Sequence, residues 1–140
     1  MTFCVAIKSK AGVVGLSDTR ISSGLGVSTS KKIQTFKGDK HSFFIMSSGL
    51  RSIRDKVIHL FEDELPHQPI DKLYKVANLI GKAVKQARHE DMETLKESKF
   101  IFDAHFILGG QCENDERSSI FLIFPEGNWV EASDESPYTV

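Results

Sequence analysis

The chain opens with Met1-Thr2-Phe3-Cys4-Val5-Ala6-Ile7. Both faces of this run are apolar, which predicts a strand in the middle of a sandwich layer. Turn residues follow at 9–12, and Val13–Asp18 reads as a returning strand. The two segments are therefore expected to form an antiparallel hairpin that brings Asp18 back beside Thr2.

Thr2 follows the initiator methionine directly, and its small side chain permits removal of Met1. An N-terminal threonine carries a nucleophile and a base on one residue, because its hydroxyl attacks while its α-amine, with a pKa of about 8, takes the proton. The alternative is that Thr2 is only the first residue of a strand, since one residue is a weak motif. The rest of the chain decides between the two.

The composition is that of a soluble globular protein, with 140 residues, 40% hydrophobic, 26% charged and a formal net charge of -1. A chain of this length predicts a single domain over residues 1–140. Lysine and arginine are dispersed among acidic residues, which argues against a nucleic-acid partner. No apolar stretch approaches the roughly 20 residues of a membrane span, and no signal peptide precedes the first strand. We therefore expect a cytoplasmic protein without a membrane partner.

Cys4 and Cys112 show no metal-ligand spacing and are expected to be buried free thiols in a reducing compartment. Catalysis by an N-terminal threonine needs neither a metal nor a nucleotide cofactor, and the lack of a Gly-rich phosphate loop agrees with this expectation.

Apolar runs near residues 27–36, 41–46, 100–110, 119–124 and 129–130 predict further strands, and the polar segment 19–26 predicts a loop. Residues 50–63 show helical periodicity. A second helix is expected from residue 70, with Gly81 allowing another backbone to approach closely. Past Arg88 the helix is mostly charged, and we expect it to face solvent or a neighbouring chain. The apolar stripe of this second helix comprises Ile70, Leu73, Val76, Ala77, Ile80, Ala83, Val84 and Ala87.

Strands in blocks on either side of a helix pair predict an α+β layered fold, with antiparallel sheets and helices stacked on a face. In this layout Asp18 ends the second strand, Lys32 lies in a later strand, and Gly49 lies where a strand gives way to a helix. A lysine beside Thr2 would lower the hydroxyl pKa, and an aspartate would hold that lysine protonated. The Gly49 N–H could meet an oxyanion at the positive end of the helix.

Each of these residues also has a structural explanation. Asp18 can cap a loop, Lys32 can be a solvated strand lysine, and Gly49 can merely allow a turn. Their joint order nevertheless resembles that of the proteasome β-type subunits and of the bacterial proteasome-related peptidases called ancestral β subunits. The residues that carry the resemblance are Thr2, Ser17-Asp18-Thr19-Arg20, Lys32-Ile33, Ser48-Gly49 and the late Gly127-Asn128-Trp129-Val130-Glu131-Ala132.

The resemblance implies an αββα four-layer sandwich of the N-terminal-nucleophile hydrolase type. It makes Thr2 the nucleophile, Asp18 and Lys32 its charge partners, and Gly49 the oxyanion donor. Ser22 matches a residue whose backbone pairs with an extended peptide substrate.

Lys32 is favoured over Lys31 because it precedes an apolar residue as the family lysine does. Alternation along a strand places these two lysines on opposite faces, so only one can point at Thr2. Arg20 is expected to support the fold or an interface.

Members of this family continue with two further helices and the last strands, and they carry later serine and aspartate residues that position the threonine. This chain stops at Val140, so the resemblance implies a domain truncated at its C-terminus, as a fragment or as a shortened product. An uncovered sheet face would then be prone to aggregation.

The expected function is hydrolysis of peptides or unfolded proteins by a threonine-type peptidase through an acyl-enzyme. The resemblance also implies a homo-oligomer, either a ring or a helical stack. Two alternatives stay open: a catalytically inactive subunit of a proteasome-like assembly, and an amidohydrolase of the same nucleophile type acting on small amides.

Overall fold

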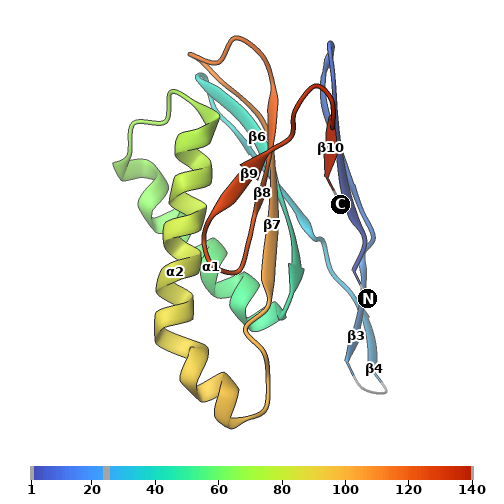
Figure 1. Ribbon diagram of the computed structural model, residues 1–140, viewed down its shortest axis with the longest axis vertical. Coiled ribbons are helices and arrows are strands. Elements are labelled where there is room, and N and C mark those ends of the chain that lie inside the picture. Colours follow the sequence, from blue (N-terminus) through green and yellow to red (C-terminus); the bar gives the residue numbers. More distant parts are fainter. Residues whose placement is uncertain (1, 24–25, 140) are drawn as a thin grey trace.

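The computed structural model describes residues 2–23 and 26–139 and has an α+β fold in three layers (Figure 1). Helices α1 (Arg51–Glu64) and α2 (Leu73–Glu97) form one outer layer. They cover one face of a five-stranded antiparallel sheet, and a smaller sheet lies against the other face. No helix of the described part is both long and apolar enough to cross a membrane.

The strands are all antiparallel, as the sequence predicts. The large sheet has the order β5 (Ile33–Lys37), β6 (His41–Gly49), β7 (Ala104–Cys112), β8 (Ser119–Ile123) and β9 (Trp129–Glu131). The small sheet has the order β10 (Tyr138–Thr139), β1 (Cys4–Ser9) and β2 (Gly12–Ser17). A short 3-10 turn, η1 (Leu65–His67), follows α1.

Three of the predicted elements differ from the structure, and one of them is the strand near residues 27–36, which is divided at residues 30–32 into two strands of different sheets. The predicted loop over residues 19–26 is largely a hairpin of β3 (Arg20–Ser23) and β4 (Gly26–Thr29), as far as its residues are described. All of β4 is exposed, so the buried alternation that reveals a strand is missing there. The strand predicted from residue 100 begins at Ala104, because the Phe100 N–H instead donates to the Leu95 carbonyl and closes the end of α2.

The main core lies between the helices and the large sheet. The predicted stripe of α2 is buried there from its second member on, which confirms the interpretation of this helix. A smaller core lies between the two sheets and contains Cys4, Ala6, Met46, Ile107 and Ile120.

The prediction that both faces of β1 are buried is wrong, because only one face is buried among the described residues. Cys4 and Ala6 face the core between the sheets, whereas Phe3 and Ile7 are each 52% exposed. Leu16 on β2 is 60% exposed as well. The outer face of the small sheet is therefore apolar and uncovered, and the described residues form three layers rather than the expected four.

Gly81 explains how α2 approaches the sheet so closely. A Cβ atom at this position would collide with the carbonyl oxygen of Gly127, in the turn between β8 and β9. This contact confirms the prediction that Gly81 admits another backbone.

Replacing Gly81 by alanine is expected to destabilise the fold by about 1–3 kcal/mol, because the turn at Gly127 must move away from α2. In an exposed helix the same change stabilises by about 1 kcal/mol. The sign of the change in unfolding free energy therefore shows whether the close contact with Gly127 is present. Urea unfolding measures the difference, with the exposed neighbour Lys82→Ala as the control. A stabilised Gly81→Ala protein would contradict the close contact.

Candidate functional site

The hairpin of β1 and β2 places Asp18 beside the start of the chain. The register Cys4↔Ser17 continues by one step, so that the Asp18 N–H donates to the Phe3 carbonyl at 3.0 Å. The Phe3 N–H in turn donates to the Asp18 Oδ1 atom at 2.9 Å. The carboxylate of Asp18 is thus held next to Thr2, in agreement with the sequence-based geometry.

Lys32 reaches the same carboxylate from the connection that precedes β5. Its Nζ donates to Asp18 Oδ1 at 2.7 Å and to the Arg20 carbonyl at 2.7 Å. Its side chain is only 3% exposed, whereas the neighbouring Lys31 is exposed. The prediction that only one of the two lysines points inward is confirmed, although Lys32 lies just before the strand and not within it.

The electrostatics of this pair follow from its hydrogen bonds. The Lys32 ammonium, and after it the Phe3 N–H, lowers the pKa of the Asp18 carboxyl below its ordinary value. Asp18 is therefore ionised at neutral pH, and its carboxylate holds the Lys32 side chain in place. An ammonium has three N–H donors, and the bonds to Asp18 and Arg20 use two of them.

Gly49 ends β6 immediately before α1, as predicted. Its φ of +106° is unfavourable for other residues, and a Cβ atom there would collide with the backbone of Asp103. The next residue, Leu50, donates its N–H to the Asp103 carbonyl at 2.9 Å and fixes the turn. The first turn of α1 carries no acidic residue, so the positive end of the helix dipole is not neutralised there.

A small cavity of about 130 Å³ brings most of the predicted site residues together. Thr2, Lys32 and Gly49 all line it, and Asp18 adjoins it through its bond to Lys32. Ser22 lines the same cavity from β3, where its backbone pairs with Val27 of β4. Four of the five residues chosen from the sequence therefore line one cavity and the fifth, Asp18, adjoins it, although each comes from a different segment of the chain.

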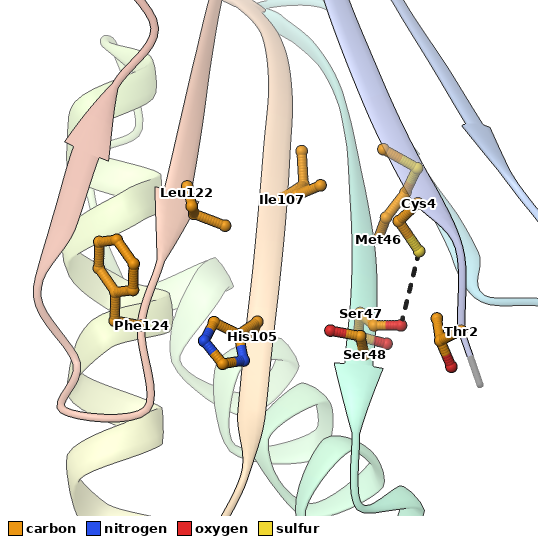
Figure 2. Close-up of a pocket in the computed structure, with 9 residues that line it drawn as sticks. All are labelled: Thr2, Cys4, Met46, Ser47, Ser48, His105, Ile107, Leu122 and Phe124. Carbon is orange, nitrogen blue, oxygen red and sulfur yellow. Dashed lines mark hydrogen bonds between the residues drawn. The ribbon is translucent and has the colours of Figure 1, made fainter. Parts of the chain in front are cut away.

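A second cavity, of about 410 Å³, lies on the other side of Thr2 between the two sheets (Figure 2). Its walls are Thr2, Cys4, Met46, Ser47, Ser48, His105, Ile107, Leu122 and Phe124. The His105 Nδ1 atom lies 3.1 Å from the Asp103 Oδ1 atom. The sequence analysis did not predict His105 as a site residue and used Ser48 only in the resemblance, because the two become neighbours through the register of β6 with β7.

Cys4 borders this second cavity but is not an activated thiol. Its Sγ lies 3.9 Å from the Ser47 carbonyl, and burial raises its pKa (Figure 2). Cys112, the last residue of β7, is also buried, and burial raises the pKa of its thiol to about 11. Both cysteines are free, as predicted. Within residues 2–23 and 26–139, no three His, Cys, Asp or Glu side chains gather where they could hold a metal ion.

Neither a protein-family model nor a curated protein matches the sequence. Several solved structures do match the fold. The Anbu (Gly-1) mutant from Hyphomicrobium sp. strain MC1 has a TM-score of 0.86 at 30% identity. Anbu (ancestral beta-subunit) from Yersinia bercovieri has a TM-score of 0.85 at 25% identity. The helical assembly of the Anbu complex from Pseudomonas aeruginosa has a TM-score of 0.87 at 21% identity.

Each of these matches covers 99% of this chain but only 59% of the similar protein. The chain thus spans well under two thirds of the length of the proteins it is similar to. Over that length the protein has the proteasome-related fold of the Anbu proteins.

Proposed function

We propose that the protein is a threonine-type peptidase of the proteasome-related N-terminal-nucleophile hydrolases. The observation that carries this proposal is the ion pair of the buried Lys32 with the half-buried Asp18 beside Thr2, with Gly49 on the same small cavity. A structural role for the pair alone would not require a hydroxyl residue or an oxyanion donor at that cavity.

In this mechanism Thr2 is the first residue of the mature chain, so Met1, which lies outside the described residues, has been removed. The Thr2 hydroxyl attacks the carbonyl carbon of a peptide bond, and its own α-amine takes the hydroxyl proton. The nearby Lys32 charge stabilises the alkoxide that forms, and the Asp18 carboxylate holds this lysine in position.

The carbonyl oxygen becomes an oxyanion, which the Gly49 N–H and the positive end of α1 stabilise. The C–N bond then breaks as the leaving amine receives the proton from the α-amine. An ester between Thr2 and the acyl group remains, and water hydrolyses it with the same amine as base.

We infer that the substrate is an extended peptide or unfolded protein lying along β3. Ser22 is exposed at the small cavity, and its backbone would pair with the peptide by strand addition.

The proposal includes a homo-oligomer in the cytoplasm. A similar protein from Pseudomonas aeruginosa forms a helical assembly. The apolar outer face of the small sheet supports a further covering layer, which would complete the αββα sandwich.

The rate of peptide hydrolysis is expected to rise with pH through the α-amine pKa of Thr2, which is about 8 for an unperturbed amine. Only the neutral amine can take the proton. Asp18 stays ionised over this range because its pKa is lowered. Its contribution to stability is present above the ordinary carboxyl pKa and is lost only as pH falls through the lowered value. Measuring kcat/KM against pH, with circular dichroism at each pH, checks this, and a flat profile would contradict the amine as base.

The experiment that tests the proposed function compares two preparations of the full-length protein. One begins at Thr2, and the other has its N-terminus blocked by a retained residue, both verified by mass spectrometry. Only the first is expected to hydrolyse fluorogenic peptides. Hydrolysis of small amides alone would indicate an amidohydrolase, and inertness of the Thr2 form on both substrates would indicate a non-catalytic subunit.

A further inference from the structure

The small cavity beside Thr2 is strongly basic. Its lining includes Arg20, Lys32, Arg51 and Arg54, and none of its described lining residues is an aspartate or a glutamate. The remaining lining residues are Thr2, Ile21, Ser22, Ser47, Ser48 and Gly49. A substrate group that enters this cavity next to the Thr2 hydroxyl would therefore meet cations on several sides.

Nearby carboxylates neutralise only part of this charge. Asp18 pairs with Lys32 at 2.7 Å. Asp55 lies 2.8 Å from Arg54 and 3.4 Å from Arg51, so one carboxylate serves two guanidinium groups. Four cations thus face two carboxylates among the described neighbours, and the cavity keeps an excess of positive charge. The electrostatic potential at the cavity favours an anionic group of the substrate.

Two of the arginines keep donors for such a group. Arg51 uses only its Nε atom on Asp55, and its side chain is 62% exposed. The Arg20 side chain makes no hydrogen bond or ion pair within the part of the chain that the structure describes. A guanidinium group presents five N–H donors in a planar fork that matches a carboxylate. Arg54, in contrast, directs two of its nitrogen atoms at Asp55.

We propose that this cavity binds a carboxylate of the substrate, held by Arg20 and Arg51 next to the bond that Thr2 cleaves. The carboxylate belongs to a glutamate or aspartate side chain or to the free C-terminus of a peptide. Its place beside a cleaved bond rests on the proposed peptidase function, whereas the binding of a carboxylate does not. A volume of about 130 Å³ suits one small acidic group.

The second cavity differs from the small cavity in the charge of its lining. Its walls are largely apolar, and His105 is its only residue of the Arg, Lys, Asp, Glu or His types among those described. An acidic side chain would lose its hydration there without an arginine to replace it. A lysine side chain would meet like charges in the small cavity. The protein should therefore distinguish acidic from neutral and basic residues at the position that faces α1.

The first test uses acetyl-Ala-Ala-X-aminomethylcoumarin peptides in which X is glutamate, glutamine or lysine. The protein that begins at Thr2 is expected to prefer glutamate over glutamine by about tenfold in kcat/KM, and the preference should shrink in 1 M NaCl. Arg51→Glu is expected to remove the preference. This variant should fold, because an acidic residue is favourable in the first turn of a helix. The matched control Arg117→Glu changes an exposed arginine between β7 and β8 and should keep the preference.

The second test separates the two sources of carboxylate. Acetyl-trialanine with a free or an amidated C-terminus competes against the glutamine peptide. Competition by the free acid alone, abolished by Arg51→Glu, assigns the cavity to a terminal carboxylate. A glutamate preference without that competition assigns it to an acidic side chain. Equal rates on glutamate and glutamine, together with equal competition by acid and amide, would overturn the proposal.

A binding experiment tests the carboxylate site independently of catalysis. Fluorescently labelled glutamate and glutamine peptides are titrated into the Thr2→Ala protein and followed by anisotropy. One outcome is that the protein beginning at Thr2 hydrolyses no peptide, while the Thr2→Ala protein binds the glutamate peptide more tightly than the glutamine peptide and Arg51→Glu abolishes this difference. The peptidase proposal then fails and the carboxylate site stands. If the glutamate and glutamine peptides are hydrolysed at equal rates and bound with equal affinity, the peptidase proposal stands and the carboxylate site fails.

Discussion

Replacing Thr2 by alanine is expected to lower kcat/KM for peptide hydrolysis by at least about a thousandfold, because the variant has no nucleophile. The α-amine, the Lys32–Asp18 pair and the Gly49 turn stay in place, so substrate binding should be retained. Fluorogenic peptide assays on protein verified to begin at residue 2 measure the effect.

Thr2→Ser is the matched control for this prediction. It keeps a hydroxyl on the N-terminal residue and removes only a methyl group, so a substantial part of the activity should remain. Thr2 precedes the first strand and is only partly buried, so neither change should affect folding. Activity in the alanine variant equal to that of the unmodified protein would require a different nucleophile.

Replacing Lys32 by methionine is expected to lower kcat by about a hundredfold to a thousandfold, similar to the loss of one oxyanion-hole donor. Methionine fills the space of the buried lysine stem but removes the charge beside Thr2. Asp18 keeps its hydrogen bond from the Phe3 N–H, which should preserve the hairpin.

Lys31→Met provides the control, because Lys31 is the exposed neighbour of the buried lysine. This variant should keep full activity. Urea unfolding of both proteins separates a loss of activity from a loss of fold. A fully active Lys32→Met protein, or equal losses in the two variants, would mean that the buried charge has no role in the reaction.

The local features of this protein could be predicted from its sequence. The long apolar stripe of α2 and the short turn between β1 and β2 each depend on neighbouring residues, so the pattern determines them. The position of Asp18 beside Thr2 follows from that turn. Gly81 could be assigned a close backbone contact because it interrupts an otherwise strong helical pattern.

Features that leave no periodic or burial pattern in the sequence were not predicted. The β3–β4 hairpin contributes little to either core, so its pattern carries no burial signal. Ser48 and His105 meet only through the pairing of β6 with β7. Arg51 and Arg54 reach the Thr2 cavity because α1 begins next to Gly49, and only the packed fold shows this.

The central claim is that Thr2, as a free N-terminal residue, is the nucleophile, and a peptide epoxyketone tests it most directly. This reagent requires both a hydroxyl and an adjacent free amine, so it reacts with an N-terminal threonine through both groups. Peptide mapping by mass spectrometry of the treated full-length protein is expected to find one adduct, on Thr2, and none in Thr2→Ala. Unmodified Thr2 in protein that demonstrably begins at this residue, or an adduct on another residue, would contradict the account.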